Sequence, residues 1–121
     1  MSHRILIVDD EPNIVISLEY LMKKEGFQVV VATNGDAALE QASAFLPELI
    51  LLDVMMPKKS GFEVCQALRA NPALTGVKII MLTAKGRETE VTKGLALGAD
   101  AYITKPFSTK DLVLQIKSML A

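Results

Sequence analysis

The sequence predicts an α/β fold in which a parallel β-sheet is covered by helices on both faces. Two observations support this: short apolar runs of strand length recur along the chain, and segments with helical spacing of apolar residues separate them. Strict alternation of strand and helix is typical of parallel strands joined by right-handed crossovers. The predicted strands span residues 5–8, 29–31, 49–52, 79–82 and 102–104.

The first and third strands are expected at the centre of the sheet. Residues 5–8 and 49–52 are apolar at every position. Strands that are apolar on both sides need cover on both faces of the sheet. Periodicity alone leaves the full strand order open.

The first two helices are predicted from apolar spacing and from residues that begin and end helices. In the first helix, apolar residues recur on one face, Pro12 suits the first turn, and Gly26 can close the end. The second helix is expected over residues 35–45, with Asn34 as its N-cap.

The remaining helices carry comparable signals. The fourth helix is expected over about residues 87–97, ending at Gly98. The third and fifth helices each open with a serine followed three residues later by an acid, the spacing of a capping box. These pairs are Ser60 with Glu63 and Ser108 with Asp111.

Length and composition predict one domain over residues 1–121 with an aliphatic core. Of the 121 residues, 50% are hydrophobic and only 5% aromatic, and this length can bury a core without disulfides or a structural metal. The formal net charge of −1 gives no general electrostatic reason to bind nucleic acid or an acidic membrane surface. We therefore expect neither partner.

The sequence also favours a cytoplasmic protein. Its apolar runs are strand-sized, whereas a membrane helix needs about 20 apolar residues. Residues 1–4 lead directly into the first strand and lack the features of a signal peptide.

The single cysteine and the single histidine are expected to have no chemical role. Cys65 lies three residues from both Phe62 and Leu68 on a predicted apolar helix face, which favours a buried structural thiol. His3 stands at the start of the first strand, where we expect it to be solvated.

Polar side chains follow four of the five predicted strands. Asp9 and Asp10 follow the first, Asp53 the third, Thr83 the fourth and Lys105 the fifth. The carboxyl ends of parallel strands share one edge of a sheet, where open α/β sheets bind ligands. Two unit charges about 4 Å apart repel by about 4 kcal/mol at an effective dielectric constant near 20. Three carboxylates at this edge therefore indicate a metal-assisted site.

This set of residues, with its flanking motifs, resembles the receiver domain of the two-component response regulators. The resemblance covers essentially the whole chain and implies one flavodoxin-like (βα)5 domain with strand order 2-1-3-4-5. The matching segments are Asp9-Asp10-Glu11, Asp53-Val54-Met55-Met56-Pro57 with Ser60-Gly61, Leu82-Thr83-Ala84, Gly98-Ala99-Asp100 and Tyr102-Ile103-Thr104-Lys105-Pro106-Phe107.

The resemblance implies a role for each site residue. Asp53 would attack the phosphohistidine of a sensor histidine kinase or a histidine phosphotransfer protein and form an aspartyl phosphate. Mg²⁺, which Mn²⁺ can replace, would bind Asp10 and Asp53 directly, Asp9 through water, and the backbone carbonyl of Met55. Lys105 would pair with Asp53 at rest and with a phosphoryl oxygen afterwards. Such a chain is no turnover enzyme, although it catalyses its own phosphorylation and dephosphorylation.

The resemblance also implies a readout. Thr83 would bond to the phosphoryl group, and Tyr102 would fill the space that the Thr83 hydroxyl leaves. The face formed by the fourth helix, fifth strand and fifth helix would then change shape toward an effector or docking partner. The Lys105–Pro106 peptide bond is expected to be cis. Met55 and Lys85 are expected to flank the path of the hydrolytic water.

A homodimer through that same face is one further expectation. Many receivers of transcription factors pair charges across it, but here much of that set is missing, so the face would dimerise mainly through apolar contact or bind another partner. The positions concerned are Val91, Ala96, Ala101 and Gln115, while Asp111 and Lys117 remain. The sequence fits both a stand-alone receiver and the receiver of a longer DNA-binding regulator.

Three alternatives share parts of the pattern. A flavodoxin-like flavin binder needs hydroxyls and backbone amides after its first strand, whereas Asp9, Asp10 and Glu11 would repel a flavin phosphate. A haloacid-dehalogenase-type phosphatase places a second aspartate two residues after its nucleophile, where this chain has Met55. A receiver-like fold that works without phosphorylation would have no need of the complete pocket.

Overall fold

The computed structural model describes residues 3–56, 59–74, 76–84 and 88–121. Within these residues, five parallel strands form one sheet in the order β2-β1-β3-β4-β5. This order confirms the doubly wound fold and the central positions of the first and third strands. The strands are β1 (Arg4–Val8), β2 (Gln28–Ala32), β3 (Leu49–Asp53), β4 (Lys78–Ala84) and β5 (Ala101–Lys105).

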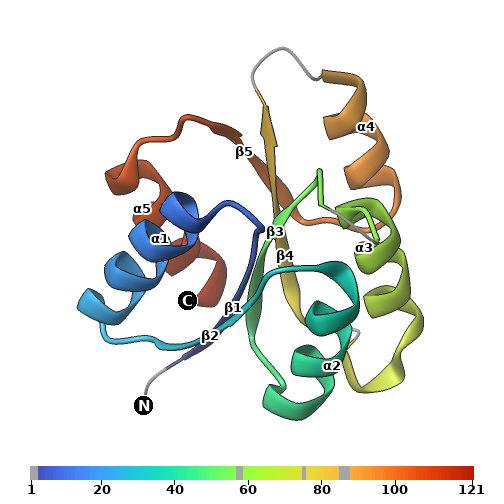
Figure 1. Ribbon diagram of the computed structural model, residues 1–121, viewed down its shortest axis with the longest axis horizontal. Helices are drawn as coiled ribbons and strands as arrows, with labels where there is room; N and C mark the ends of the chain where they lie inside the picture. The colour runs from blue at the N-terminus through green and yellow to red at the C-terminus, as the bar shows by residue number, and fades with distance from the viewer. Residues whose placement is uncertain (1–2, 57–58, 75, 85–87) are drawn as a thin grey trace.

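Helices cover both faces of the sheet, as predicted. Figure 1 shows α1 and α5 on one face and α2, α3 and α4 on the other. A short 3₁₀ helix, η1 (Pro72–Leu74), was not predicted, because a single turn has no apolar period to detect. The α-helices are α1 (Pro12–Lys24), α2 (Gly35–Phe45), α3 (Gly61–Ala70), α4 (Glu88–Ala96) and α5 (Thr109–Leu120).

Two apolar layers, one on each side of the sheet, form the core. Alternate residues of a strand point to opposite faces. In β1, Ile5 and Ile7 therefore pack toward α1 and α5, whereas Leu6 and Val8 pack toward α2 and α3. All four side chains are fully buried, which explains why this strand is apolar at every position.

The predicted helix signals operate as expected. The Asn34 side chain accepts a hydrogen bond from the Ala37 N–H at 2.8 Å. Ser60 and Glu63 form both bonds of the capping box. Gly26 and Gly98 follow their helices with φ of 89° and 112°, the left-handed conformation that glycine adopts readily.

The last helix shows one of the two bonds of its predicted capping box. Ser108 caps α5 by accepting from the Asp111 N–H at 3.3 Å. The predicted start of the fourth helix, residue 87, lies outside the described residues.

The structure confirms that Cys65 is buried but corrects the expectation for His3. The Cys65 thiol donates to the Leu97 carbonyl at 3.7 Å, and burial raises its pKa. His3 is only partly exposed, and its Nδ1 lies 2.7 Å from Glu48 Oε2. The two residues are 45 positions apart, so strand pairing, not local sequence, creates this contact. No helix in the described part of the chain is long and apolar enough to cross a membrane.

Candidate functional site

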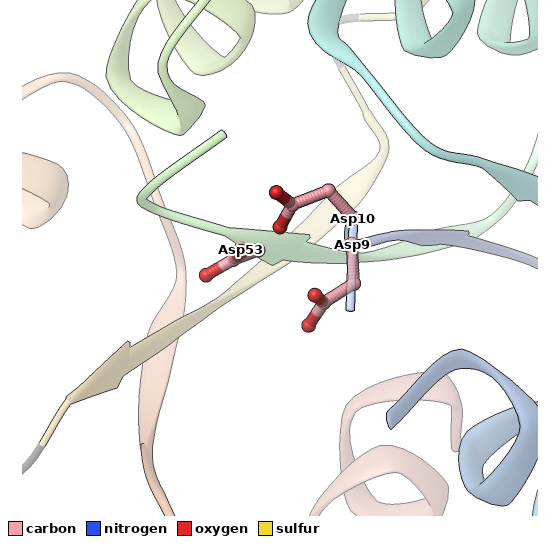
Figure 2. A group of neighbouring side chains, drawn as sticks. All are labelled: Asp9, Asp10 and Asp53. Carbon is pink, nitrogen blue, oxygen red and sulfur yellow. The ribbon is translucent and has the colours of Figure 1, made fainter. Parts of the chain in front are cut away.

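The carboxyl ends of β1 and β3 bring three aspartates together. Asp53 is the last residue of β3, and Asp9 and Asp10 directly follow β1. These strands are neighbours with Val8 opposite Leu52, so Asp9 lies level with Asp53. One carboxylate oxygen from each of Asp9, Asp10 and Asp53 lies within 4.8 Å of the others. Figure 2 shows the carboxylates of Asp9 and Asp10 turned toward the strand end that carries Asp53.

Asp9 is fully buried, and both of its carboxylate oxygens have partners. Its backbone N–H continues the pairing with β2 by donating to the Ala32 carbonyl at 3.2 Å. Its Oδ1 accepts from the Glu11 N–H at 3.0 Å, and its Oδ2 accepts from Lys105 Nζ at 2.8 Å. Each carboxylate oxygen of Asp9 is thus held by one hydrogen bond.

Lys105, the last residue of β5, reaches both buried acids. Its Nζ lies 2.8 Å from Asp9 Oδ2 and 3.4 Å from Asp53 Oδ1. Burial opposes the charge of Lys105, but the hydrogen bond to Asp9 and the charge of Asp53 outweigh it and hold its pKa above the usual value. The shorter contact to Asp9 was not predicted, because the two residues are 96 positions apart and no local pattern links them.

The surroundings of Asp53 disfavour its negative charge. Burial first and the Asp9 carboxylate second raise the pKa of Asp53 to about 6, although Lys105 opposes the shift. A cation beside these acids would reverse this effect by stabilising the charged form. The donor set, carboxylate oxygens on a small cluster with the exposed Asp10 at its edge, fits a hard divalent ion such as Mg²⁺.

The chain after Asp53 bends tightly around the site. The Met55 N–H donates to Asp53 Oδ1 at 3.4 Å, and the Met55 side chain is exposed. The Gly61 N–H donates to the Val54 carbonyl at 2.8 Å, which closes the loop between β3 and α3. A Cβ on Gly61 would overlap the Asp53 carbonyl oxygen, so only glycine fits here. Pro57, another residue of the predicted motif, lies outside the described residues.

Of the remaining predicted residues, Thr83 lies near this edge of the sheet, whereas Tyr102 lies near the start of β5, opposite Met81. Thr83 is buried near the end of β4, one residue beyond Leu82, which is opposite Asp53. Tyr102 lies on β5 and is 46% exposed, so the ring is directed outward. The predicted cis peptide bond between Lys105 and Pro106 is confirmed. Lys85 lies outside the described residues.

A five-stranded doubly wound sheet with acids, a buried threonine and a lysine at its carboxyl edge defines the class of response regulator receivers. The family model of the response regulator receiver domain matches residues 5–117, and the chain belongs to this family. It is therefore the receiver domain of a two-component response regulator, a class whose members interact with histidine kinases and effectors.

Individual relatives agree with this assignment. The chain is 45% identical over 120 residues to the alkaline phosphatase synthesis transcriptional regulatory protein PhoP of Bacillus subtilis, covering 99% of this chain and 49% of that protein. It is 44% identical over 120 residues to the phosphate regulon transcriptional regulatory protein PhoB of Rhizobium meliloti, covering 99% of this chain and 53% of that protein. The chain thus spans about half the length of these curated relatives.

A solved structure shows the same fold. The chemotaxis response regulator CheY4 of Vibrio cholerae superposes with a TM-score of 0.93 at 28% sequence identity. The match covers 98% of this chain and 99% of that one.

Proposed function

We propose that Asp53 accepts a phosphoryl group from the phosphohistidine of a sensor histidine kinase or a histidine phosphotransfer protein. The observation that carries the proposal is the placement of the Asp53 carboxylate beside Asp9, Asp10 and Lys105. An Asp53 oxygen bonds to phosphorus as the bond from phosphorus to the histidine nitrogen breaks. The histidine ring keeps that electron pair and takes a proton, and Asp53 becomes an aspartyl phosphate.

A divalent ion is part of this proposal. Asp10 and Asp53 would hold Mg²⁺, or Mn²⁺ in its place, with Asp9 acting through water and Met55 through its backbone carbonyl. When bound, the ion offsets the repulsion between the acids and the incoming phosphoryl group. Catalysis then rests on position and charge, as in other phosphoryl transfers.

Lys105 supplies a second positive charge that can follow the reaction. Its Nζ already lies between Asp9 and Asp53, so a short movement brings it to an oxygen of the new phosphoryl group. Under this proposal, the chain is a phosphoacceptor that also catalyses its own dephosphorylation, and no turnover enzyme. We also propose that the chain carries out this function in the cytoplasm.

The proposed readout passes through Thr83 and Tyr102. A phosphoryl oxygen on Asp53 would attract the Thr83 hydroxyl, and the outward ring of Tyr102 would then move toward the space vacated. The face formed by α4, β5 and α5 would present this change to an effector, or to a second copy of the chain. Lys117, a charge that the resemblance assigns to this face, is already paired within the chain, to Glu25 directly after α1 at 2.6 Å, which supports apolar contact over an exchange of salt bridges.

Labelling with acetyl phosphate tests the proposal. Wild-type protein with Mg²⁺ is expected to gain an acid-stable, base-labile phosphoryl label, and EDTA is expected to prevent it. Asp53→Asn should abolish the label, whereas Glu40→Gln, an exposed carboxylate-to-amide change on α2, should leave it intact. Unchanged label in Asp53→Asn would refute the assignment.

A further inference from the structure

We propose that Gly35, at the start of α2 and outside the acid cluster, is a positioning residue for Asp53. Its lack of a side chain allows the segment that leads into α3 to lie directly against α2. That segment in turn fixes the backbone of Asp53. The inference rests on the proposed function of Asp53, which ends β3, but it concerns a residue on helix α2.

Gly35 is buried against the residue that precedes the cap of α3. A Cβ on Gly35 would overlap the Cβ of Lys59, and would lie 2.9 Å from the Lys59 carbonyl oxygen and 3.1 Å from Val64 Cγ2. Two of these atoms are fixed to the Lys59 backbone, so no change of side-chain rotamer can make room. Any side chain at Gly35 must therefore move the backbone at Lys59.

Space, not backbone conformation, explains the glycine at position 35. Gly26 and Gly98 have positive φ, but Gly35 does not. Alanine has a higher helix propensity than glycine by about 1 kcal/mol, so propensity alone would favour alanine at this helical position. The contact with Lys59 is what excludes it.

A second close contact, between Gly61 and the end of β3, links the backbone near Lys59 to Asp53. Gly61, two residues after Lys59, donates its N–H to the Val54 carbonyl at 2.8 Å. A Cβ on Gly61 would overlap the Asp53 carbonyl oxygen and lie 2.9 Å from Val54 Cα. The backbone at residues 59–61 is therefore wedged between the start of α2 and the end of β3.

Hydrogen bonds fix the helix starts on both sides of residues 59–61. The start of α2 is fixed by the Asn34 cap, and the start of α3 is fixed by the capping box of Ser60 and Glu63. Lys59 Nζ also lies 3.8 Å from Asp36 Oδ1 in the first turn of α2. Figure 1 shows α2 and α3 side by side on the same face of the sheet. A shift at Lys59 is thus expected to pass to Gly61 and Asp53.

Gly35→Ala tests this, with Gly76→Ala as the matched control because a Cβ on Gly76 meets no atom within 4 Å. Small misplacements of reacting groups have large kinetic effects, so we expect Gly35→Ala to weaken Mg²⁺ binding and slow labelling by acetyl phosphate, each by about three- to tenfold. Gly76→Ala should leave both within about twofold of wild type. Calorimetric Mg²⁺ titration gives the affinity, and urea unfolding gives the stability.

A rescue variant separates positioning from general damage. Lys59→Gly removes the Cβ that Gly35→Ala would strike most closely but keeps the Lys59 carbonyl oxygen at 2.9 Å, so rescue should be partial. Relative to the Lys59→Gly single variant, the double variant should lose less Mg²⁺ affinity and labelling rate than Gly35→Ala loses relative to wild type. If Gly35→Ala does not fold, the double variant must fold and recover the label. Failure of that rescue, or a Gly35→Ala protein that matches Gly76→Ala in affinity and rate, would overturn the inference. If wild type takes no label, the proposed function fails, while the Mg²⁺ affinities still judge the role of Gly35.

Discussion

Replacing Asp53 with asparagine is expected to stabilise the metal-free protein at neutral pH. Asp53 is buried beside Asp9, and these surroundings raise its pKa from its ordinary value of 3.8 to about 6. The protonated, neutral carboxyl is therefore the form that the folded state favours. Asparagine is neutral at every pH and keeps a similar shape.

The sign and size follow from linkage between protonation and folding. A group whose folded pKa is raised contributes stability that is complete below pH 3.8 and is lost as pH rises through about 6. The shift corresponds to about 3 kcal/mol, a net value that already includes the opposing effect of Lys105. The unfolding free energy of Asp53→Asn should therefore exceed that of wild type by about 2 to 3 kcal/mol near pH 7.5, and by only about 0.5 kcal/mol near pH 4.

Urea unfolding followed by far-UV circular dichroism, with EDTA present, measures this difference. Glu40→Gln removes an exposed carboxylate and should leave the unfolding free energy within about 0.5 kcal/mol of wild type. Saturating Mg²⁺ should narrow the gap, because the ion binds and stabilises the wild-type acids. If Asp53→Asn is no more stable than wild type near pH 7.5, then the folded protein does not disfavour the negative charge of Asp53, and the reasoning fails.

Three further predictions concern the lysine, the loop and the signalling face. Lys105→Met removes the ammonium group that Asp9 and Asp53 share, so it should lower the unfolding free energy of the metal-free protein by about 2 to 4 kcal/mol. The loss should be smaller when Mg²⁺ is bound, and equal losses with and without the ion would count against a shared site. Substituting Met55, or Lys85 outside the described residues, should change the rate of dephosphorylation more than the rate of phosphorylation. Decay and uptake of the label measure the two rates, and equal effects on both would contradict the prediction. Sedimentation with a phosphoryl analogue and Mg²⁺ should show that any dimer through α4, β5 and α5 persists in high salt, since much of the charge set is missing; a strong dimer that salt abolishes would contradict this.

Local signals explain why the elements could be predicted closely. The second helix begins at Gly35 and ends at Phe45 as predicted, because the Asn34 cap and the apolar period act within a few residues. Most strand ends were predicted one or two residues short, since the polar residues and alanines that finish a strand, such as Lys105 and Ala84, carry little apolar signal. The acids at the strand ends could be grouped because parallel strands share an edge.

Contacts between distant segments could not be predicted in the same way. The ion pair of Lys105 with Asp9 and the hydrogen bond of His3 with Glu48 depend on how strands are ordered and how side chains pack. The raised pKa of Asp53 depends on burial, which a sequence pattern indicates only as a tendency. The requirement for glycine at position 35 arises from Lys59, a neighbour 24 residues away in the segment that precedes α3.

The central claim is that Asp53, and neither Asp9 nor Asp10, receives the phosphoryl group. Protein treated with acetyl phosphate and Mg²⁺ can be reduced with borohydride, which converts an aspartyl phosphate to homoserine at the modified position. Peptide mass spectrometry is expected to find homoserine at position 53 in wild type and at no aspartate position in Asp53→Asn. Homoserine at position 9 or 10 in wild type, or none at position 53 in Mg²⁺-treated protein that carries label, would contradict the claim.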